Sequence, residues 1–189
     1  MLTITENDFR EVLDTLGFND ESLEESVKEL LLLCEKELKN SINPVFVFKV
    51  FDYKDGTVVG SNFDLEGHTI KDHLDGCKKC ACLCVTLGGD VDNLIRKKQI
   101  TSMAEAMMID KLASYIVEKE CDRAEVIVMR NFDRCQKTTR YGLGYGDFPV
   151  TKQKEFLEML EAERTVGVHA NEASFLIPTK SVTCIIGIE

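Results

Sequence analysis

The chain has 189 residues, of which 44% are hydrophobic and 30% are charged, and its formal net charge is −10. This length and composition fit one ordinary globular domain and argue against disorder. The negative net charge disfavours nucleic acid as a partner, because the phosphate backbone would repel an acidic protein. We find no apolar run approaching the roughly 18–20 residues of a membrane span, and no signal peptide, so we expect a cytoplasmic protein without a membrane partner.

The N-terminal region predicts two amphipathic helices. Apolar residues from Phe9 to Leu16 recur at helical spacing. A second stripe, from Leu23 to Leu38, begins at Ser22-Leu-Glu-Glu25, which is typical of a capping box. We expect a single domain over residues 1–189, in which residues 1–42 form a helical appendage and residues 43–189 form the body.

The first half of the body indicates antiparallel strands. Val45–Tyr53 is rich in Val and Phe and predicts a strand, Asp55-Gly56 predicts a hairpin turn, and Thr57–Ser61 predicts the partner strand. We expect a short helix near Thr69–Leu74 and a buried strand over Cys80–Leu87.

The second half of the body mixes helices and strands. We expect a short helix over 91–98 and then the longest helix, which begins at 101 or 102 and ends between 121 and 135. A glycine-rich loop over 137–150 leads into a helix that is capped by Thr151 and followed by Gly167. After residues 173–177 and Pro178, a strand over 181–188 closes the chain. Together the elements predict an α+β fold with a mostly antiparallel twisted sheet packed with helices.

A cysteine cluster, Cys77-Lys-Lys-Cys80-Ala-Cys82-Leu-Cys84, is a candidate metal site. On a strand, alternate residues share one face at steps of about 6.6 Å. Thiolates around one tetrahedral ion must come within about 4 Å of each other. We therefore interpret the cluster as core packing by reduced thiols, with a metal site, or a redox pair of Cys77 and Cys80, as the alternative.

The segment Arg140-Tyr-Gly-Leu-Gly-Tyr145-Gly-Asp-Phe-Pro149 is the main candidate for binding. An arginine offers a planar fork for a carboxylate, and the glycines let the backbone approach a ligand. Tyr141, Tyr145 and Phe148 offer flat faces for a heteroaromatic ring or a sulfonium cation. The pattern suits an amino acid joined to a nucleoside, and a structural glycine loop with a buried arginine is the alternative.

This segment resembles the Arg-x-x-x-Gly-Tyr loop of the activation domain of cobalamin-dependent methionine synthase, which is also followed by a proline and a helix. Asn171-Glu172 and Pro178-Thr-Lys-Ser181-Val resemble the family's Thr-Glu and Pro-x-x-Ser-Val motifs, and Val85–Gly89 resembles its strand end before the long helix. The resemblance covers about residues 64–188.

The resemblance implies that the chain has the fold of that domain and binds S-adenosylmethionine. Arg140 would hold the methionine carboxylate, and Gly144 and Tyr145 would shape the site by backbone and ring contacts. The expected binding residues are Arg140, Gly144, Tyr145, Tyr141, Pro178 and Ser181. The domain of that family presents the methyl group to oxidised cobalamin, and an electron from a flavodoxin-like donor completes the reductive methylation.

The sequence carries no recognisable homocysteine-, folate- or cobalamin-binding module. The resemblance therefore implies a free-standing form of the domain that serves a separately encoded methionine synthase or another corrinoid protein, which would carry the cobalamin. We expect an accessory protein without catalytic residues of its own. An autonomous methyltransferase with a small substrate and a cysteine-based metal or redox module are the alternatives.

Overall fold

The computed structural model describes residues 25–132 and 135–189. The helix predicted over Phe9–Leu16 and the capping residue Ser22 lie outside the described residues. The described chain divides into two compact units, one of residues 25–42 and 90–116 and the other of residues 43–89 and 117–189. The first unit combines part of the predicted appendage with residues that the prediction assigned to the body.

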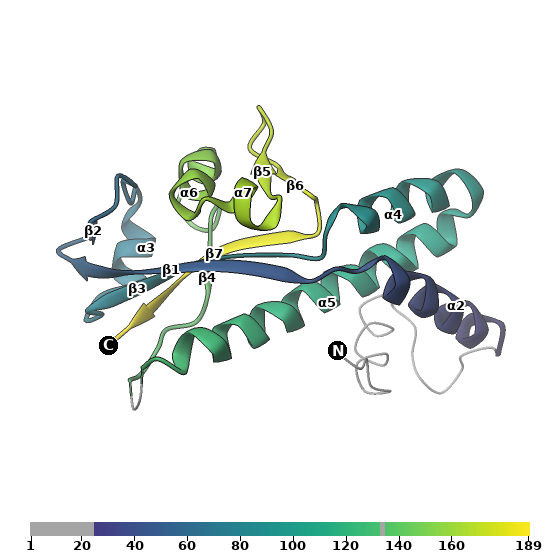
Figure 1. Cartoon of the computed structure of the whole chain (residues 1–189), viewed down its shortest axis with the longest axis horizontal. Helices are drawn as coiled ribbons and strands as arrows, with labels where there is room; N and C mark the ends of the chain where they lie inside the picture. The colour runs from purple at the N-terminus through teal and green to yellow at the C-terminus, as the bar shows by residue number, and fades with distance from the viewer. Residues whose placement is uncertain (1–24, 133–134) are drawn as a thin grey trace. The chain divides into compact units, whose positions relative to one another are not determined.

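The elements of the structure follow the predicted order closely (Figure 1). The helices are α2 (Glu25–Ser41), α3 (His68–His73), α4 (Gly89–Thr101), α5 (Met103–Met129), α6 (Gln153–Leu160) and α7 (Ala162–Val166), with a 3-10 turn at Val150–Lys152. The strands are β1 (Val45–Lys54), β2 (Thr57–Val59), β3 (Lys79–Thr86), β4 (Tyr141–Gly142), β5 (His169–Ala170), β6 (Leu176–Ile177) and β7 (Ser181–Ile188). None of these described helices combines the length and the hydrophobicity that a membrane crossing requires.

Five strands form one antiparallel sheet in the order β2-β1-β3-β7-β4, which confirms the predicted α+β class. The central strand β3 pairs along its whole length with β7, from Lys79 opposite Ile188 to Thr86 opposite Ser181. The edge strand β4 pairs with β7 through Tyr141 opposite Ile185. The strands β5 and β6 form a separate hairpin.

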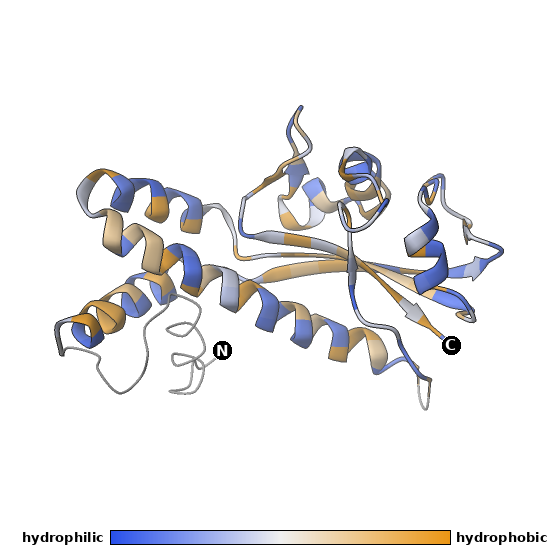
Figure 2. Ribbon diagram, turned by 180° about the vertical axis from the view of Figure 1, so that it is seen from behind, coloured by the Kyte–Doolittle hydropathy of each residue, from blue (hydrophilic) through white to orange (hydrophobic). Residues whose placement is uncertain are grey.

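Both faces of the central strands are buried. Cys80, Cys82 and Cys84 share one face of β3 and belong to the core that includes Phe156 and Leu160 of α6. Since side chains alternate along a strand, Ala81, Leu83 and Val85 point to the other face, on which the C-terminal part of α5 lies (Figure 1). Figure 2 shows the matching hydropathy, with hydrophobic residues on the central strands and mixed residues on the helices.

The buried hydroxyl of Thr183 on β7 ties α6 to the sheet. It donates a hydrogen bond of 2.8 Å to the side-chain oxygen of Gln153, the first residue of α6. Both side chains are buried, so each satisfies a polar group that would otherwise be costly to bury. This bond helps to fix the start of α6, and with it the exit of the glycine-rich loop.

The first unit is a bundle of α2, α4 and the N-terminal part of α5. Its polar centre is Lys98 of α4, which makes ion pairs of 2.7 Å with Glu37 and 2.5 Å with Glu105. Hydrogen bonds to these two carboxylates raise the pKa of Lys98 above its ordinary value. The helix α5 begins where predicted, because the hydroxyl of Ser102 accepts a hydrogen bond from the backbone N–H of Glu105.

Two predicted boundaries near the C-terminus are wrong. Thr151 does not cap a helix, because the chain already turns at Pro149, and Thr151 lies inside the 3-10 turn. The expected single helix is broken at Glu161, whose φ of 57° is left-handed, and Gly167 ends the second piece, α7. The hairpin of β5 and β6 was not predicted, and it is an addition to the expected elements.

We expect the thiols to differ sharply in reactivity, because Cys135 is exposed and the other seven cysteines are buried. Burial raises the pKa of Cys84 to about 12 and of Cys34 to about 11, so little reactive thiolate forms at pH 8. Titration of the native protein with a thiol reagent should show one fast-reacting group, which Cys135→Ser abolishes, and eight groups after denaturation. Rapid reaction of Cys77 or Cys80 would instead favour a redox role for the cluster.

Candidate functional site

The loop that contains the predicted binding residues runs along the free edge of the sheet. The N–H of Thr138 donates to the carbonyl of Gly187 at 3.0 Å, and further on Gly142 pairs with Cys184 of β7. The loop was expected to be irregular over residues 137–150, so β4 is an addition to the prediction. This pairing gives the segment an extended backbone, on which successive side chains point to opposite sides of the sheet.

Arg140 points towards α5. Its Nη1 donates to Asp122 at 2.6 Å and to Glu125 at 3.2 Å, and its Nη2 donates to Glu118 at 3.2 Å. Burial would lower the pKa of Arg140, but the hydrogen bond that it donates to Asp122 and the neighbouring carboxylates together raise it above its ordinary value. The guanidinium therefore stays charged, and only 22% of this side chain is exposed.

The three carboxylates occupy positions i, i+4 and i+7 of α5, which places them on one face of the helix. Glu118 and Asp122 are each 57% exposed, whereas Glu125 is 12% exposed and also pairs with Lys137 at 2.7 Å. Three negative groups thus face two positive groups, Arg140 and Lys137. The cluster carries one surplus negative charge.

A cavity of about 420 Å³ opens beside these residues. We call it the Arg140 pocket, and it is lined by Glu118, Asp122 and Glu125 of α5, by Lys137, Thr139, Arg140, Tyr141, Gly142 and Tyr145 of the loop, and by Val182 and Cys184 of β7. Its volume lies within the usual range for small-molecule sites, roughly 300–1,000 Å³. It combines a guanidinium, carboxylates and an aromatic ring in one place.

Tyr145 provides the aromatic surface of the pocket. It is 69% exposed, and its ring lies against Gly142. A Cβ atom at Gly142 would come within 2.7 Å of the Tyr145 ring, so this position has to be glycine for the ring to lie there. The left-handed Gly144, with a φ of 93°, turns the chain between the two.

Tyr141 and Phe148 point away from α5, into the other face of the sheet. The hydroxyl of Tyr141 donates to Oγ1 of Thr69 at 2.7 Å, although the residue is still part of the lining of the Arg140 pocket. Phe148 is 1% exposed and packs edge-on against Phe63. The expectation that Phe148 offers a face to a ligand is therefore wrong, since this ring is buried in the hydrophobic core.

The remaining predicted binding residues lie outside the lining of the Arg140 pocket. Gly144 is adjacent to it in the chain and packs near Val150. The hydroxyl of Ser181 bonds to Thr86 and to the carbonyl of Pro178, at the far end of β7. The structure therefore brings Arg140, Tyr141 and Tyr145 together, and places Pro178 and Ser181 at a separate turn.

Asp147 connects the loop to α3. Its Oδ2 accepts the backbone N–H of His68 at 2.7 Å, and its Oδ1 accepts the N–H of Thr69 at 3.0 Å and the hydroxyl of Thr69 at 2.5 Å. These bonds, led by the one from the Thr69 hydroxyl, lower the pKa of Asp147 to about 2. Sequence reasoning missed this contact, and it also missed the three carboxylates of α5, which their helical spacing could have indicated.

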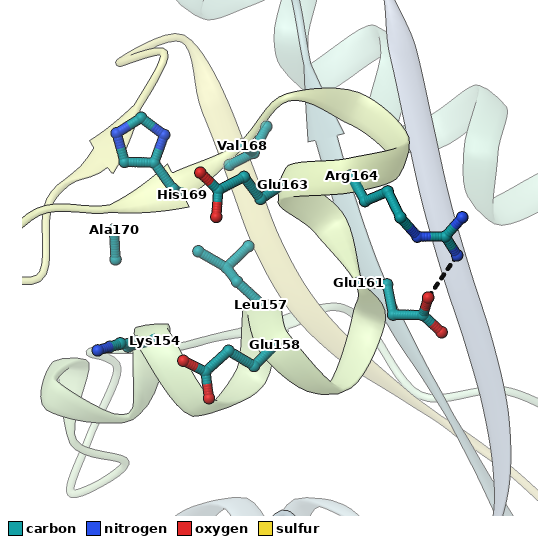
Figure 3. Close-up of a pocket in the computed structure, with 9 residues that line it drawn as sticks. All are labelled: Lys154, Leu157, Glu158, Glu161, Glu163, Arg164, Val168, His169 and Ala170. Atoms are coloured by element: carbon teal, nitrogen blue, oxygen red, sulfur yellow. Dashed lines mark hydrogen bonds and ion pairs between the residues drawn. The ribbon is translucent and has the colours of Figure 1, made fainter.

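A larger cavity of about 580 Å³ lies between α6, α7 and β5 (Figure 3). Its floor is Leu157 and Val168, and charged side chains surround it. Glu161 on this rim is held by ion pairs with Lys49 and Arg164. None of the six predicted binding residues lines this cavity, so we place the candidate site at the Arg140 pocket.

The cysteine cluster shows no arrangement for a metal ion. Among the described residues, which include all eight cysteines, no group of three or more His, Cys, Asp or Glu side chains has the geometry to hold one. Cys82 is fully buried, and a hydrogen bond involving Cys80, together with burial, raises its pKa well above the ordinary value.

The comparisons with known proteins concern the fold. We find no protein-family model that matches the sequence, and no curated protein that matches it. Among solved structures, the chain is similar to the MetH reactivation domain bound to AdoHcy (S-adenosylhomocysteine), with a TM-score of 0.64 and 18% sequence identity. The similarity covers 95% of this chain and 69% of that chain. The chain thus has the fold of this reactivation domain, as the sequence resemblance implied.

Loss of Arg140 should destabilise the protein, because three carboxylates of α5 would then face one another with only Lys137 nearby. We expect Arg140→Gln to lower the free energy of unfolding by about 1–2 kcal/mol. Arg164→Gln is the matched control, since Arg164 pairs with Glu161 at the exposed surface and should contribute less than about 0.5 kcal/mol. Equal urea midpoints for the two variants would show that the cluster is not held by Arg140.

The stabilising effect of Asp147 should depend on pH. The folded pKa is lowered to about 2, so the contribution is complete above the pKa of an unfolded aspartate, about 3.9, and is lost as the pH falls towards 2. Urea unfolding between pH 2 and pH 6 should therefore show Asp147→Asn less stable than the wild type near neutrality, with the two proteins converging at the acid end. A difference that stays constant over this range would contradict the assignment.

Proposed function

We propose that this chain binds S-adenosylmethionine in the Arg140 pocket and serves as the reactivation partner of a cobalamin-dependent methionine synthase in the cytoplasm. The observation that carries the proposal is the pocket itself. It gathers a guanidinium, carboxylates and an exposed tyrosine ring from the Arg140–Tyr145 segment and α5. The fold on which it lies is one that has been solved, in another protein, with the demethylated form of this ligand bound.

The ligand carries groups that complement each part of the pocket. Arg140 offers its planar fork to the methionine carboxylate. The carboxylates of Glu118 and Asp122 suit the ammonium group and the sulfonium cation. The ring of Tyr145 supplies a flat face for the adenine or for the sulfonium. Because S-adenosylmethionine carries two positive groups and one negative group, the surplus negative charge of the pocket favours it.

The ion pairs of Arg140 are compatible with this role if binding exchanges them. A carboxylate that takes the guanidinium from α5 would leave the α5 carboxylates uncompensated, which is costly. The ammonium group of the same ligand can take the place of the guanidinium beside Glu118 or Asp122. A ligand with both charges can therefore enter at a lower cost than a simple carboxylic acid.

The residues of this chain would bind and orient the methyl donor, and no covalent step is assigned to them. Holding the sulfonium in a fixed direction at an open sheet edge lowers the entropic cost of methyl transfer to a second protein. The partner would carry the cobalamin that accepts the methyl group, and a flavodoxin-like donor would supply the electron. The same arrangement could serve another corrinoid protein, which the partner experiment below separates from methionine synthase.

Calorimetric titration with S-adenosylmethionine tests the ligand. The wild type should bind, and Arg140→Gln should bind about 10- to 100-fold more weakly, because a charged hydrogen-bonded pair is lost. Arg164→Gln should bind as tightly as the wild type, since Arg164 lies on the other cavity. Absence of binding by the wild type, both alone and with the corrinoid partner present, would refute the proposal.

Reconstitution tests the partner. We expect the chain, S-adenosylmethionine with a labelled methyl group and reduced flavodoxin to restore an oxidised methionine synthase that lacks its own reactivation domain. Label should pass to the cobalamin, and Arg140→Gln should slow this transfer. Transfer to a different corrinoid protein alone would reassign the partner, and label transfer to a small molecule without any corrinoid protein would indicate an autonomous methyltransferase.

A further inference from the structure

Each end of the short helix α3 contacts the loop that contains Arg140 and Tyr145. His73 lies at the C-terminal end of α3, and its Nε2 is 2.9 Å from the carbonyl oxygen of Thr139, the residue before Arg140. Thr69 and His68 lie at the other end and bind Asp147, two residues after Tyr145. The helix thus spans the segment that supplies the arginine and the exposed tyrosine of the Arg140 pocket.

The hydroxyl of Thr69 is the central group of this contact. It donates to Oδ1 of Asp147, and it accepts hydrogen bonds from the hydroxyl of Tyr141 at 2.7 Å and from the N–H of Asp147 at 3.3 Å. A hydroxyl has one donor and two acceptor lone pairs, so these three bonds use its whole capacity. One side chain therefore joins two points of the loop.

Two glycines make this close approach possible. A Cβ atom at Gly146 would lie 2.5 Å from Oγ1 of Thr69 and 2.6 Å from the hydroxyl of Tyr141. A Cβ atom at Gly67 would lie 2.9 Å from Oδ1 of Asp147. Both residues also have positive φ, 54° and 107°, which a side chain would strain. Glycine at these two positions therefore allows the close contact between α3 and the loop.

We infer that Thr69 and Asp147 are positioning residues of the Arg140 pocket. Tyr141 follows Arg140 on an extended strand, so a hydrogen bond that fixes Tyr141 on the α3 side fixes the direction of Arg140 on the α5 side. The bonds of Asp147 likewise limit the movement of Tyr145. The inference rests on the proposed function, and it assigns to α3 the ordering of the loop before the ligand arrives, which reduces the entropy lost on binding.

Three threonine variants test this inference in the full chain. Thr69→Val removes the hydroxyl and keeps the size of the side chain, whereas Thr69→Ser keeps the hydroxyl. Thr165→Val is the matched control, because the hydroxyl of Thr165 bonds only locally, to the carbonyl of Glu161 at 2.8 Å. We expect Thr69→Val to weaken binding of S-adenosylmethionine about three- to tenfold, and Thr69→Ser and Thr165→Val to bind like the wild type.

Hydrogen exchange decides the inference independently of the ligand. The N–H groups of Gly144 and Phe148 are bonded within the loop, to Phe148 and Tyr145. They should exchange faster in Thr69→Val than in the wild type or Thr165→Val, while the amides of β3 and β7 stay protected. Unchanged loop exchange in Thr69→Val would overturn the inference, and so would wild-type affinity in that variant. Absence of binding by every protein would refute the proposed function, and the loop exchange would still decide the role of α3.

Discussion

The pairing of two residues at the sheet edge determines the rest of the candidate site. Tyr141 and Gly142 pair with β7, and this short ladder forces the loop to alternate between two faces. Arg140 is thereby directed to the carboxylates of α5, and Tyr141 to the hydroxyl of Thr69. Without the ladder, a segment with three glycines would have no fixed direction for either side chain.

The charges around Arg140 limit which ligands could bind at this edge of the sheet. Arg140 in a neutral cavity would bind any small carboxylate, but here it is surrounded by acidic residues that must themselves be compensated. The two carboxylates that are most exposed, Glu118 and Asp122, are those best placed to receive a cation. The lining of the larger cavity beside α6 also has three carboxylates against two cations, but it contains no arginine beside a tyrosine ring and none of the predicted binding residues.

The sequence predicted the features that depend on local patterns. The strands β1 and β7, the turn at Asp55-Gly56 and the start of α5 near Ser102 follow from residue periodicity and turn chemistry, and all are present. The buried cysteine strand was also predicted, because Cys80–Leu87 is apolar except for Thr86. What the sequence could not provide are contacts between distant segments. The break at Glu161, the strand β4 and the burial of Phe148 all depend on packing against residues far away in the chain.

The same division applies within the candidate site. Arg140 and Tyr145 could be identified because their segment concentrates charge, rings and glycines in six residues. Asp147 could not, because its partners Thr69 and His68 are 78 and 79 residues away. The carboxylates of α5 are an intermediate case, since their spacing shows that they share a face but not that Arg140 lies opposite.

The position of the pocket at an open edge agrees with the function proposed for it. A site that completes its own chemistry gains from excluding water, and cores and deep clefts provide that. A site that passes a methyl group to another protein must leave the reacting atom accessible to that protein. The strand β4 is only two residues long, and it leaves Tyr145 exposed while Arg140 remains mostly covered. The anchoring group of the proposed ligand would thus be held inside, and the rest of the pocket stays open at the sheet edge, where a second protein can approach.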